Sequence, residues 1–282
     1  MKTIALVGSP NCGKTTLFNA VTGLHQHVGN WAGVTVERKE GTQNGVRWVD
    51  LPGVYALSPY SAEEKVTIDY LSGGDYDEIL QIVDATALAR GLYLTHQLTQ
   101  LSRPMTIALN MMDECRKRGI TIDTEELSAR LGIRVLPMSA RDGTGVPELL
   151  RALKDGAKTP KSPPSAPYTA IIQRMKSALP AGNLPSEFRA WKALEGDEMG
   201  AAAAARAGQA QLRAQSGMSA AAALSALRYA WADDLCATVR RGNPDNPTRA
   251  DVVDALVLHP VLALPILAGL LALMLSLIHI SE

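Results

Sequence analysis

The octapeptide from Gly8 to Thr15, GSPNCGKT, constrains this chain more than any other stretch. It matches the pattern G-x-x-x-x-G-K-[ST] and lies between an apolar run, Thr3–Val7, and a stretch of helical character, Thr16–Val21. A strand, this loop and a helix in that order indicate a phosphate-binding P-loop. The residues of the loop that we expect to bind nucleotide are Gly8, Ser9, Pro10, Asn11, Cys12, Gly13, Lys14, Thr15 and Thr16.

The chemistry of phosphate binding explains the residue types in this loop. Glycines let successive backbone N–H groups close around the β-phosphate, and the start of a helix supplies positive potential. Lys14 is expected to neutralise β- and γ-oxygens, and the Thr15 hydroxyl to hold Mg²⁺. A thiol inside such a loop could have a lowered pKa, but we interpret Cys12 as a small residue that fills a variable position.

Short apolar runs alternate with longer stretches of helical period from Thr3 to about Lys158. This alternation predicts an α/β domain with a doubly wound, mainly parallel sheet. Strands are expected at Thr3–Val7, Val34–Glu40, Arg47–Asp50, Glu78–Val83, Met105–Asn110 and Arg134–Met138. Helices are expected to begin at the P-loop and near Glu63, Arg90, Thr124 and Pro147.

The composition changes after this first domain, which we place at residues 1–158. Residues 159–167, TPKSPPSAP, are rich in proline and predict a semi-rigid linker. Residues 168–248 lose the strand pattern and are rich in Ala, Leu, Arg, Gln and Glu, which predicts a small all-α domain. Its Ala-rich stretch, Gly200–Arg213, could instead be a flexible surface insertion.

Residues 249–282 are predicted to hold the start of a transmembrane helix. The run Val261–Ile278 carries no charge and approaches the roughly 20 apolar residues that cross a bilayer as a helix. The alternative is a buried core helix, but the many Leu, Ile and Val side chains favour insertion. Arginines before the run, the last of them Arg249, favour the cytoplasmic side for everything that precedes it. The closing SLIHISE ends abruptly, so a truncated or chimeric end is expected.

Charge and cysteine content argue against several classes of protein. The 28 basic and 28 acidic residues cancel, so bulk nucleic-acid binding has no support. Cys12, Cys115 and Cys236 form no C-x-x-C or Cys/His pattern, which fits a reducing cytosol better than disulfides or a zinc site. His25 and His27 lack a nearby carboxylate pair, and we interpret them as solvated polar residues rather than as metal ligands.

Three further motifs decide between ATP and GTP. Asp50–Gly53, DLPG, follows an apolar strand, which would place Asp50 near Mg²⁺ and the Gly53 N–H near the γ-phosphate. Asn110–Asp113, NMMD, also follows a strand, and Asp113 there would accept from the guanine N1 and N2 amines, a donor pair that adenine lacks. The residues expected to contact the base are Asn110, Met111, Asp113, Ser139, Ala140 and Arg141. In this order the motifs predict a small-GTPase-like domain.

Several stretches resemble the FeoB family, one of the translation-factor-like GTPases. Val28–Lys39, VGNWAGVTVERK, is similar to that family's first switch region, and Asp50–Leu57, DLPGVYAL, to its second. Ala108–Glu114, ALNMMDE, is similar to its base-recognition loop. The resemblance is close from Met1 to about Lys158. By position, the helical segment corresponds to the family's domain proposed to slow GDP release, and LHPVLALPI, Leu258–Ile266, resembles the opening of its first transmembrane helix.

The resemblance implies roles for the switch residues. Thr35 would bring its hydroxyl to Mg²⁺ and its backbone to the γ-phosphate, with Gly33 and Val34 beside the nucleotide. Val54 stands where many signalling GTPases have a glutamine that orients water, which valine cannot do. Asn11 matches an asparagine that in relatives helps hold K⁺, which would neutralise charge between the β- and γ-phosphates; alternatively, Asn11 only shapes the loop. The expected catalytic residues are Asn11, Lys14, Thr35 and Gly53, and the expected Mg²⁺ ligands are Thr15, Thr35 and Asp50.

The implied function is GTP binding and slow, potassium-stimulated GTP hydrolysis that regulates ferrous iron uptake at the bacterial inner membrane. The implied cofactors are GTP/GDP, Mg²⁺ and K⁺. The implied partners are Fe(II) as cargo of a downstream membrane region, the lipid bilayer, a small cytosolic Feo protein and further copies of the chain.

Two alternatives share these motifs. A soluble GTPase acting on ribosome or tRNA would need a basic appended domain, and a nucleotide-gated module with negligible turnover is compatible with the missing glutamine. The part that Trp31 plays in the first switch stays open, since it could shield the nucleotide or pack against a partner.

Overall fold

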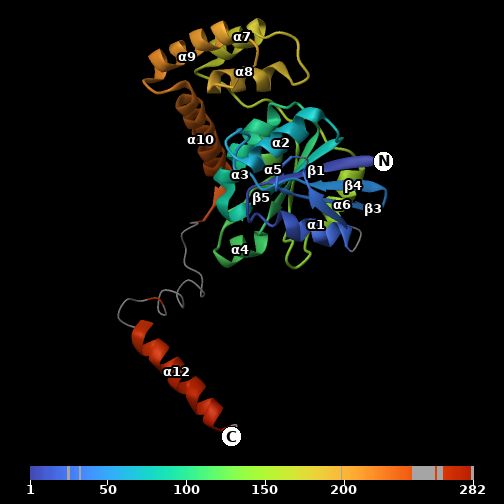
Figure 1. The fold of residues 1–282 in the computed structure, drawn as a ribbon, viewed down its shortest axis with the longest axis vertical. Helices are drawn as coiled ribbons and strands as arrows, with labels where there is room; N and C mark the ends of the chain where they lie inside the picture. Colours follow the sequence, from blue (N-terminus) through green and yellow to red (C-terminus); the bar gives the residue numbers. More distant parts are fainter. Residues whose placement is uncertain (24–25, 32, 198, 243–257, 259–262, 281–282) are drawn as a thin grey trace.

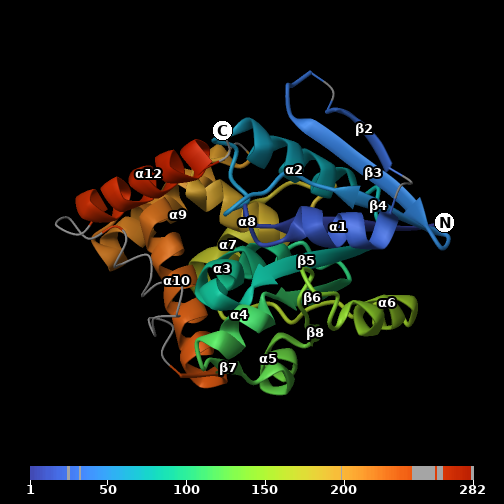
Figure 2. The same ribbon diagram turned by 90° about the horizontal axis from the view of Figure 1, so that it is seen from below.

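The computed structural model describes residues 1–23, 26–31, 33–197, 199–242, 258 and 263–280. Its centre is a seven-stranded sheet in the order β2-β3-β4-β1-β5-β6-β8, with helices on both sides (Figures 1 and 2). From β4 to β8 the neighbouring strands are parallel, whereas β2, β3 and β4 pair antiparallel. The strands are β1 Lys2–Gly8, β2 Gln26–Asn30, β3 Glu37–Gln43, β4 Val46–Asp50, β5 Glu78–Asp84, β6 Met105–Asn110, β7 Thr121–Ile122, β8 Arg134–Pro137 and β9 Arg240–Arg241.

Helices connect the parallel strands and continue beyond the sheet. They are α1 Lys14–Thr22, α2 Ala62–Gly73, α3 Leu88–Thr99, α4 Met112–Lys117, α5 Thr124–Leu131, α6 Val146–Lys154, α7 Thr169–Ala178, α8 Ser186–Glu195, α9 Ala202–Ser216, α10 Ala220–Val239 and α12 Ala263–Ile280. A single 3-10 turn, Ala85–Ala87, precedes α3. The predicted α/β fold is confirmed.

One predicted strand, Val34–Glu40, is wrong at its start. The strand there, β3, begins only at Glu37, and β2 before it was not predicted. The reason is a local turn: the Trp31 N–H donates to the Val36 carbonyl at 2.9 Å, and Gly33 has a φ of 77°. This hydrogen bond closes a turn ahead of β3, so the alternation of valines there does not make a strand.

The core lies on the two faces of the central strands. Successive residues of β1 alternate between them: Ile4 and Leu6 join a cluster with Phe18 of α1, whereas Ala5 and Val7 join a cluster with side chains of α3. All four are fully buried. Because both faces of a parallel sheet are covered, its central strands read as nearly continuous apolar runs.

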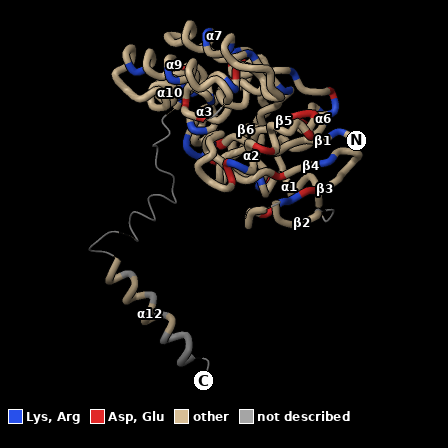
Figure 3. Tube along the Cα trace, turned by 45° about the horizontal axis from the view of Figure 1, so that its top comes forward, with Lys and Arg blue, Asp and Glu red and all other residues tan. Residues whose placement is uncertain are grey.

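The helical part, α7–α10, has a core of its own around Trp191 of α8. The Ala-rich stretch is the helix α9, which buries Ala205 and Leu212. The helix α10 leaves this cluster and descends along α3 (Figure 1), so that Leu235 and Val239 near its end join the core of the sheet. Figure 3 shows Lys/Arg and Asp/Glu scattered over the described part of the tube, and the two kinds are equal in number in the sequence, 28 each.

A polar cluster joins the helical part to the sheet. His96 of α3 is fully buried, with its ring centroid 5.1 Å from that of Trp191 and 5.2 Å from that of Trp231. Beside it, the Nζ of Lys192 donates to the Leu57 carbonyl, and Arg228 pairs with Glu195. Burial, helped by the nearby Arg228 cation, lowers the pKa of His96 from 6.5 to about 3.

The depressed pKa of His96 should make the fold sensitive to acid. The unfolded chain takes up this proton as the pH falls through 6.5, whereas the folded chain takes it up only near pH 3. The contribution is therefore present above pH 6.5 and is lost as the pH falls, by at most about 1.4 kcal/mol per pH unit. Urea unfolding between pH 7 and 4 should show a weaker acid dependence for His96→Phe than for the unsubstituted chain, and parallel curves would contradict this assignment.

The predicted membrane span, Val261–Ile278, lies only partly within the described residues. Its first residues, and the predicted boundary at 248 with Arg249, lie outside the described residues. The described remainder belongs to the 18-residue helix α12. No helix among the described residues is both long enough and apolar enough to cross a membrane.

Candidate nucleotide-binding site

The P-loop connects the end of β1 to the first turn of α1. Gly13 caps α1 with a φ of 89°, and Asn11 has a φ of 62°, so both residues adopt the left-handed conformation. A side chain on Gly13 would collide with the amide of Asn110, so only glycine fits there. The loop is therefore shaped by its neighbours as well as by its own sequence.

Asn110 joins three loops at the ends of three parallel strands. Its Nδ2 donates to the Cys12 carbonyl of the P-loop at 2.8 Å, and its Oδ1 accepts from the Ala140 N–H at 2.8 Å. It is 3% exposed. This one side chain thus fixes the distance between the P-loop and the two segments expected to contact the base.

The cavity at the P-loop has a volume of about 520 Å³. Its lining residues are Ser9, Pro10, Asn11, Gly13, Lys14, Thr15, Thr16, Gly53 and Met111. The fold thus brings the P-loop together with Gly53 of the second switch and Met111 of the NMMD motif. Gly53 lies so close to Pro10 that a Cβ there would be 3.1 Å from the Pro10 Cα.

Lys14, which lines this cavity, forms a buried ion pair with Asp50. Their exposed fractions are 9% and 6%. Burial raises the pKa of Asp50, against the opposing influence of the Lys14 cation. Thr15 and Thr16 are exposed in the first turn of α1, so their hydroxyls remain accessible to a ligand.

The residues expected to contact the base differ in exposure. Asp113 lies half-buried in the first turn of α4, and this helix begins directly after Met111, whose φ is 64°. Ser139 and Ala140 are buried, and the Ser139 N–H donates to the Thr144 carbonyl at 2.9 Å. The Arg141 side chain is 82% exposed.

Some of the expected residues are not brought to the cavity. Thr35 and Gly33 are exposed, Val34 is half-buried, and the described part of the first switch contributes nothing to the lining. Cys12 is 1% exposed, and burial raises its pKa to about 11, which favours its interpretation as a filling residue.

Two residues near the second switch escaped sequence reasoning. The Gln97 side-chain oxygen accepts from the Leu57 N–H at 2.7 Å, and the Nζ of Lys192 donates to the Leu57 carbonyl. The end of the second switch is therefore tied through its backbone to α3 and α8. The one available signal was a polar side chain, Gln97, among the apolar positions of α3.

The comparison with known families decides the classification. The family model FeoB_N, described as ferrous iron transport protein B, matches residues 2–153. The chain belongs to the FeoB family. It is 39% identical to the Fe(2+) transporter FeoB of Shigella flexneri over 293 aligned positions, which cover 96% of this chain and 38% of that protein.

Other FeoB proteins are similar to narrower parts of the chain. The Fe(2+) transport protein A/Fe(2+) transporter FeoB fusion protein of Porphyromonas gingivalis is 44% identical over 212 residues, which cover 69% of this chain and 25% of that protein. A GDP-bound mutant of the S. thermophilus FeoB G-domain superposes with a TM-score of 0.79 at 36% identity, covering 86% of this chain and 100% of that one. The chain thus spans between a quarter and two fifths of these curated transporters.

Proposed function

We propose that the chain binds GTP and GDP in the P-loop cavity and hydrolyses GTP to GDP and phosphate. The link that Asn110 makes between the P-loop and the Ala140 loop carries this proposal. It supports one site for phosphates and base together, at the carboxyl ends of parallel strands where such folds bind nucleotides.

At the phosphate end, backbone N–H groups of the P-loop and the ammonium of Lys14 would bind the β- and γ-oxygens. The Gly53 N–H would contact the γ-phosphate, since Gly53 lines the same cavity. At the base end, Asp113 would accept from guanine N1 and N2, flanked by Met111 and the Ser139–Arg141 loop.

Oxygen-bearing residues at the P-loop fit a magnesium ion. Mg²⁺ prefers oxygen ligands, and two are available: the hydroxyl of Thr15, which lines the cavity, and the carboxylate of Asp50, which pairs with the neighbouring Lys14. Thr35 would complete the set once the first switch moves toward the cavity. When bound, Mg²⁺ neutralises charge on the phosphate oxygens. Among the described residues, no group of three or more His, Cys, Asp or Glu side chains could hold a further metal.

Val54 does not contribute to the hydrolytic step. It is 2% exposed and part of the core, so it neither faces the cavity nor positions the attacking water. We infer that turnover is slow and that K⁺, held in part by the Asn11 amide oxygen, supplies the missing charge stabilisation. Asn11 lines the cavity with an exposed side chain, which supports this role.

Removing the Asn11 side chain should abolish stimulation by potassium. We expect the unsubstituted chain to hydrolyse GTP about tenfold or more faster in KCl than in NaCl, an effect within the range of one stabilising contact to the transition state. Asn11→Gly is the cleanest variant, because glycine tolerates the φ of 62° that strains alanine. It should give equal rates in both salts.

Turnover by Asn11→Ala and Asn11→Asp completes the design. Asn11→Asp keeps an oxygen donor and should retain some potassium dependence. Equal rates for the unsubstituted chain in both salts would remove potassium from the proposal, and turnover below detection in both would favour a nucleotide-gated module.

For the complete protein we propose that GTP-dependent motion regulates ferrous iron transport at the bacterial inner membrane, with this portion on the cytoplasmic side. The names of the relatives support Fe(II) as cargo. The fusion protein of P. gingivalis supports a small Feo protein as partner. Contacts with the lipid bilayer and self-association are part of the same proposal. A ribosome-associated role is disfavoured, because the net charge is zero and the family is FeoB.

A further inference from the structure

Trp31 of the first switch packs against the helix that follows the second switch. Its ring centroid is 5.4 Å from that of Tyr70 in α2, in an edge-to-face arrangement with an interplanar angle of 70°. On the other side, the Arg38 guanidinium lies 4.7 Å from the Trp31 ring. Both rings pack against the core cluster of the sheet. The residue thus has partners inside its own chain, at the edge of the sheet where α2 lies beside β3 (Figure 2).

The backbone couples the position of Trp31 to that of Thr35. The Trp31 N–H donates to the Val36 carbonyl at 2.9 Å, and the Val34 N–H donates to the Trp31 carbonyl at 3.2 Å. These bonds close the Trp31–Val36 turn, which carries Thr35 on its exposed side. Thr35 does not line the P-loop cavity, so its approach to the cavity would strain the two hydrogen bonds that join Trp31 to Val34 and Val36 on either side of Thr35.

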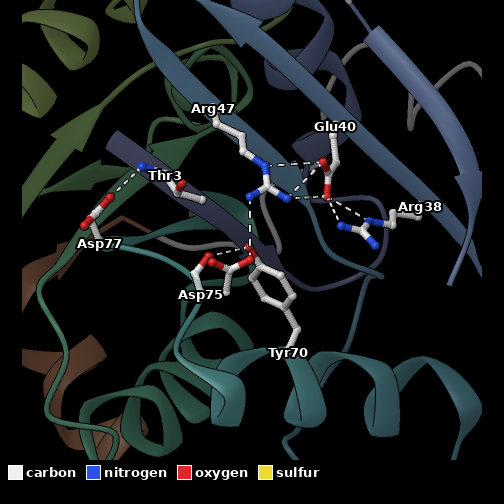
Figure 4. Close-up of polar contacts among 7 residues, drawn as sticks. All are labelled: Thr3, Arg38, Glu40, Arg47, Tyr70, Asp75 and Asp77. Carbon is white, nitrogen blue, oxygen red and sulfur yellow. Dashed lines mark hydrogen bonds and ion pairs between the residues drawn. The ribbon is translucent and has the colours of Figure 1, made fainter. Parts of the chain in front are cut away.

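Charged residues around Tyr70 stabilise the packing of Tyr70 against Trp31 (Figure 4). The Tyr70 hydroxyl donates to the Asp75 carbonyl at 2.9 Å, and the Asp75 carboxylate lies 3.6 Å from Arg47. Arg47 lies 3.1 Å from Glu40, which in turn accepts from Arg38 at 2.8 Å. The contacts therefore run in a closed circuit from Trp31 through α2, β4 and β3 and back to the Trp31 ring.

The indole N–H of Trp31 is buried and has no hydrogen-bond partner among the described residues. An unpaired buried N–H is unfavourable, so the indole ring is held by its contacts with Tyr70 and Arg38 and by no hydrogen bond of its own. Release of the ring would let this N–H reach water, which keeps the contact reversible.

We propose that Trp31 and Tyr70 are positioning residues that hold the Trp31–Val36 turn against α2 and keep Thr35 away from the phosphates. This proposal rests on the proposed function, because it takes Thr35 as the residue that must reach Mg²⁺ and the γ-phosphate. Binding of GTP then has to break the ring contact, whereas binding of GDP does not. The contact therefore sets the preference between the two nucleotides.

The experiment compares Trp31→Ala with Trp31→Phe, and Tyr70→Leu with Tyr70→Phe. The phenylalanine variants keep an aromatic contact, whereas the others remove it. An aromatic pair and a cation–π contact together correspond to about a 5- to 30-fold effect. Relative to GDP, affinity for the β,γ-imido analogue of GTP should rise by this factor in Trp31→Ala. In Tyr70→Leu, which leaves the Arg38 contact in place, it should rise by about 2- to 12-fold, the share of the aromatic pair alone. The phenylalanine variants should stay within about twofold of the unsubstituted chain.

Amide hydrogen exchange of the Trp31–Val36 turn without nucleotide tests the contact itself. Exchange should accelerate by a similar factor in Trp31→Ala but not in Trp31→Phe, and combining Trp31→Ala with Tyr70→Leu should add little. Unchanged exchange in Trp31→Ala would overturn the proposal, as would faster exchange with an unchanged nucleotide ratio. If the unsubstituted chain binds neither nucleotide, the proposed function fails, and the exchange rates alone still decide whether the ring contact holds the turn.

Discussion

Asp113→Asn should change the nucleotide preference from GTP to xanthosine triphosphate. The carboxylate of Asp113 would accept two hydrogen bonds from guanine, whereas an amide there places its NH₂ group against the guanine 2-amino donor. Loss of two hydrogen bonds to a charged group corresponds to roughly a 100-fold or greater loss of GTP affinity. Xanthine has a carbonyl at that position, which accepts from the new amide, so its affinity should rise. Competition binding with GTP, XTP and ATP measures all three.

A gain in XTP affinity would distinguish a change of specificity from misfolding, because a misfolded variant would not gain affinity for any nucleotide. Glu114→Gln is a matched control, because Glu114 is the neighbouring acidic residue of α4 but pairs with Lys117 at 2.7 Å. It should leave the preference for GTP intact. If Asp113→Asn lowered the affinities for GTP and XTP by the same factor, Asp113 would have no part in base recognition.

Lys192→Met should destabilise the folded chain by about 3–5 kcal/mol, the usual cost of removing one partner from a buried charge cluster. Lys192 is 3% exposed, and its Nζ lies 2.9 Å from Glu195 and 3.7 Å from Asp197 besides donating to Leu57. Methionine has a similar length, so the loss reflects charge rather than volume. Leu57 would also lose its carbonyl partner, which should loosen the end of the second switch.

Lys176→Met is the matched control for this change. Lys176 pairs with Glu187 at 2.7 Å in the same helical part, but its side chain is 27% exposed. Such a pair contributes at most about 1 kcal/mol. Urea unfolding should separate the two variants clearly. Similar free energies of unfolding for Lys192→Met and Lys176→Met would contradict this prediction, because they would mean that the buried carboxylates near Lys192 do not need its charge.

The features that could be predicted from the sequence are those that depend on contiguous residues. The P-loop needs glycines, a lysine and a threonine at fixed spacing, and its neighbouring strand is a continuous apolar run, so GSPNCGKT and Thr3–Val7 were recognisable at once. The sequence indicates that Asn110 belongs to a base loop. It does not indicate the two hydrogen bonds of Asn110 with Cys12 and Ala140, because those partners follow distant strands.

The first switch shows where sequence reasoning ended. The alternating valines of Val34–Glu40 favour a strand, yet the hydrogen bond between Trp31 and Val36 makes a turn first. The choice depends on Tyr70, which holds Trp31 from another element. Lys192 posed the same difficulty, since a lysine in a helix is usually solvated and its partner Leu57 lies 135 positions earlier.

The geometry of Asn110 limits how a chain like this can diverge. Its amide must donate a hydrogen bond on one side and accept one on the other. An ionised aspartate cannot donate, a serine side chain is too short, and a glutamine side chain is too long. No single replacement preserves both bonds. An altered base or phosphate specificity reached through this position would therefore require simultaneous changes in three loops, so new specificities are more accessible through Asp113 or the cavity rim than through the residue that holds the loops together.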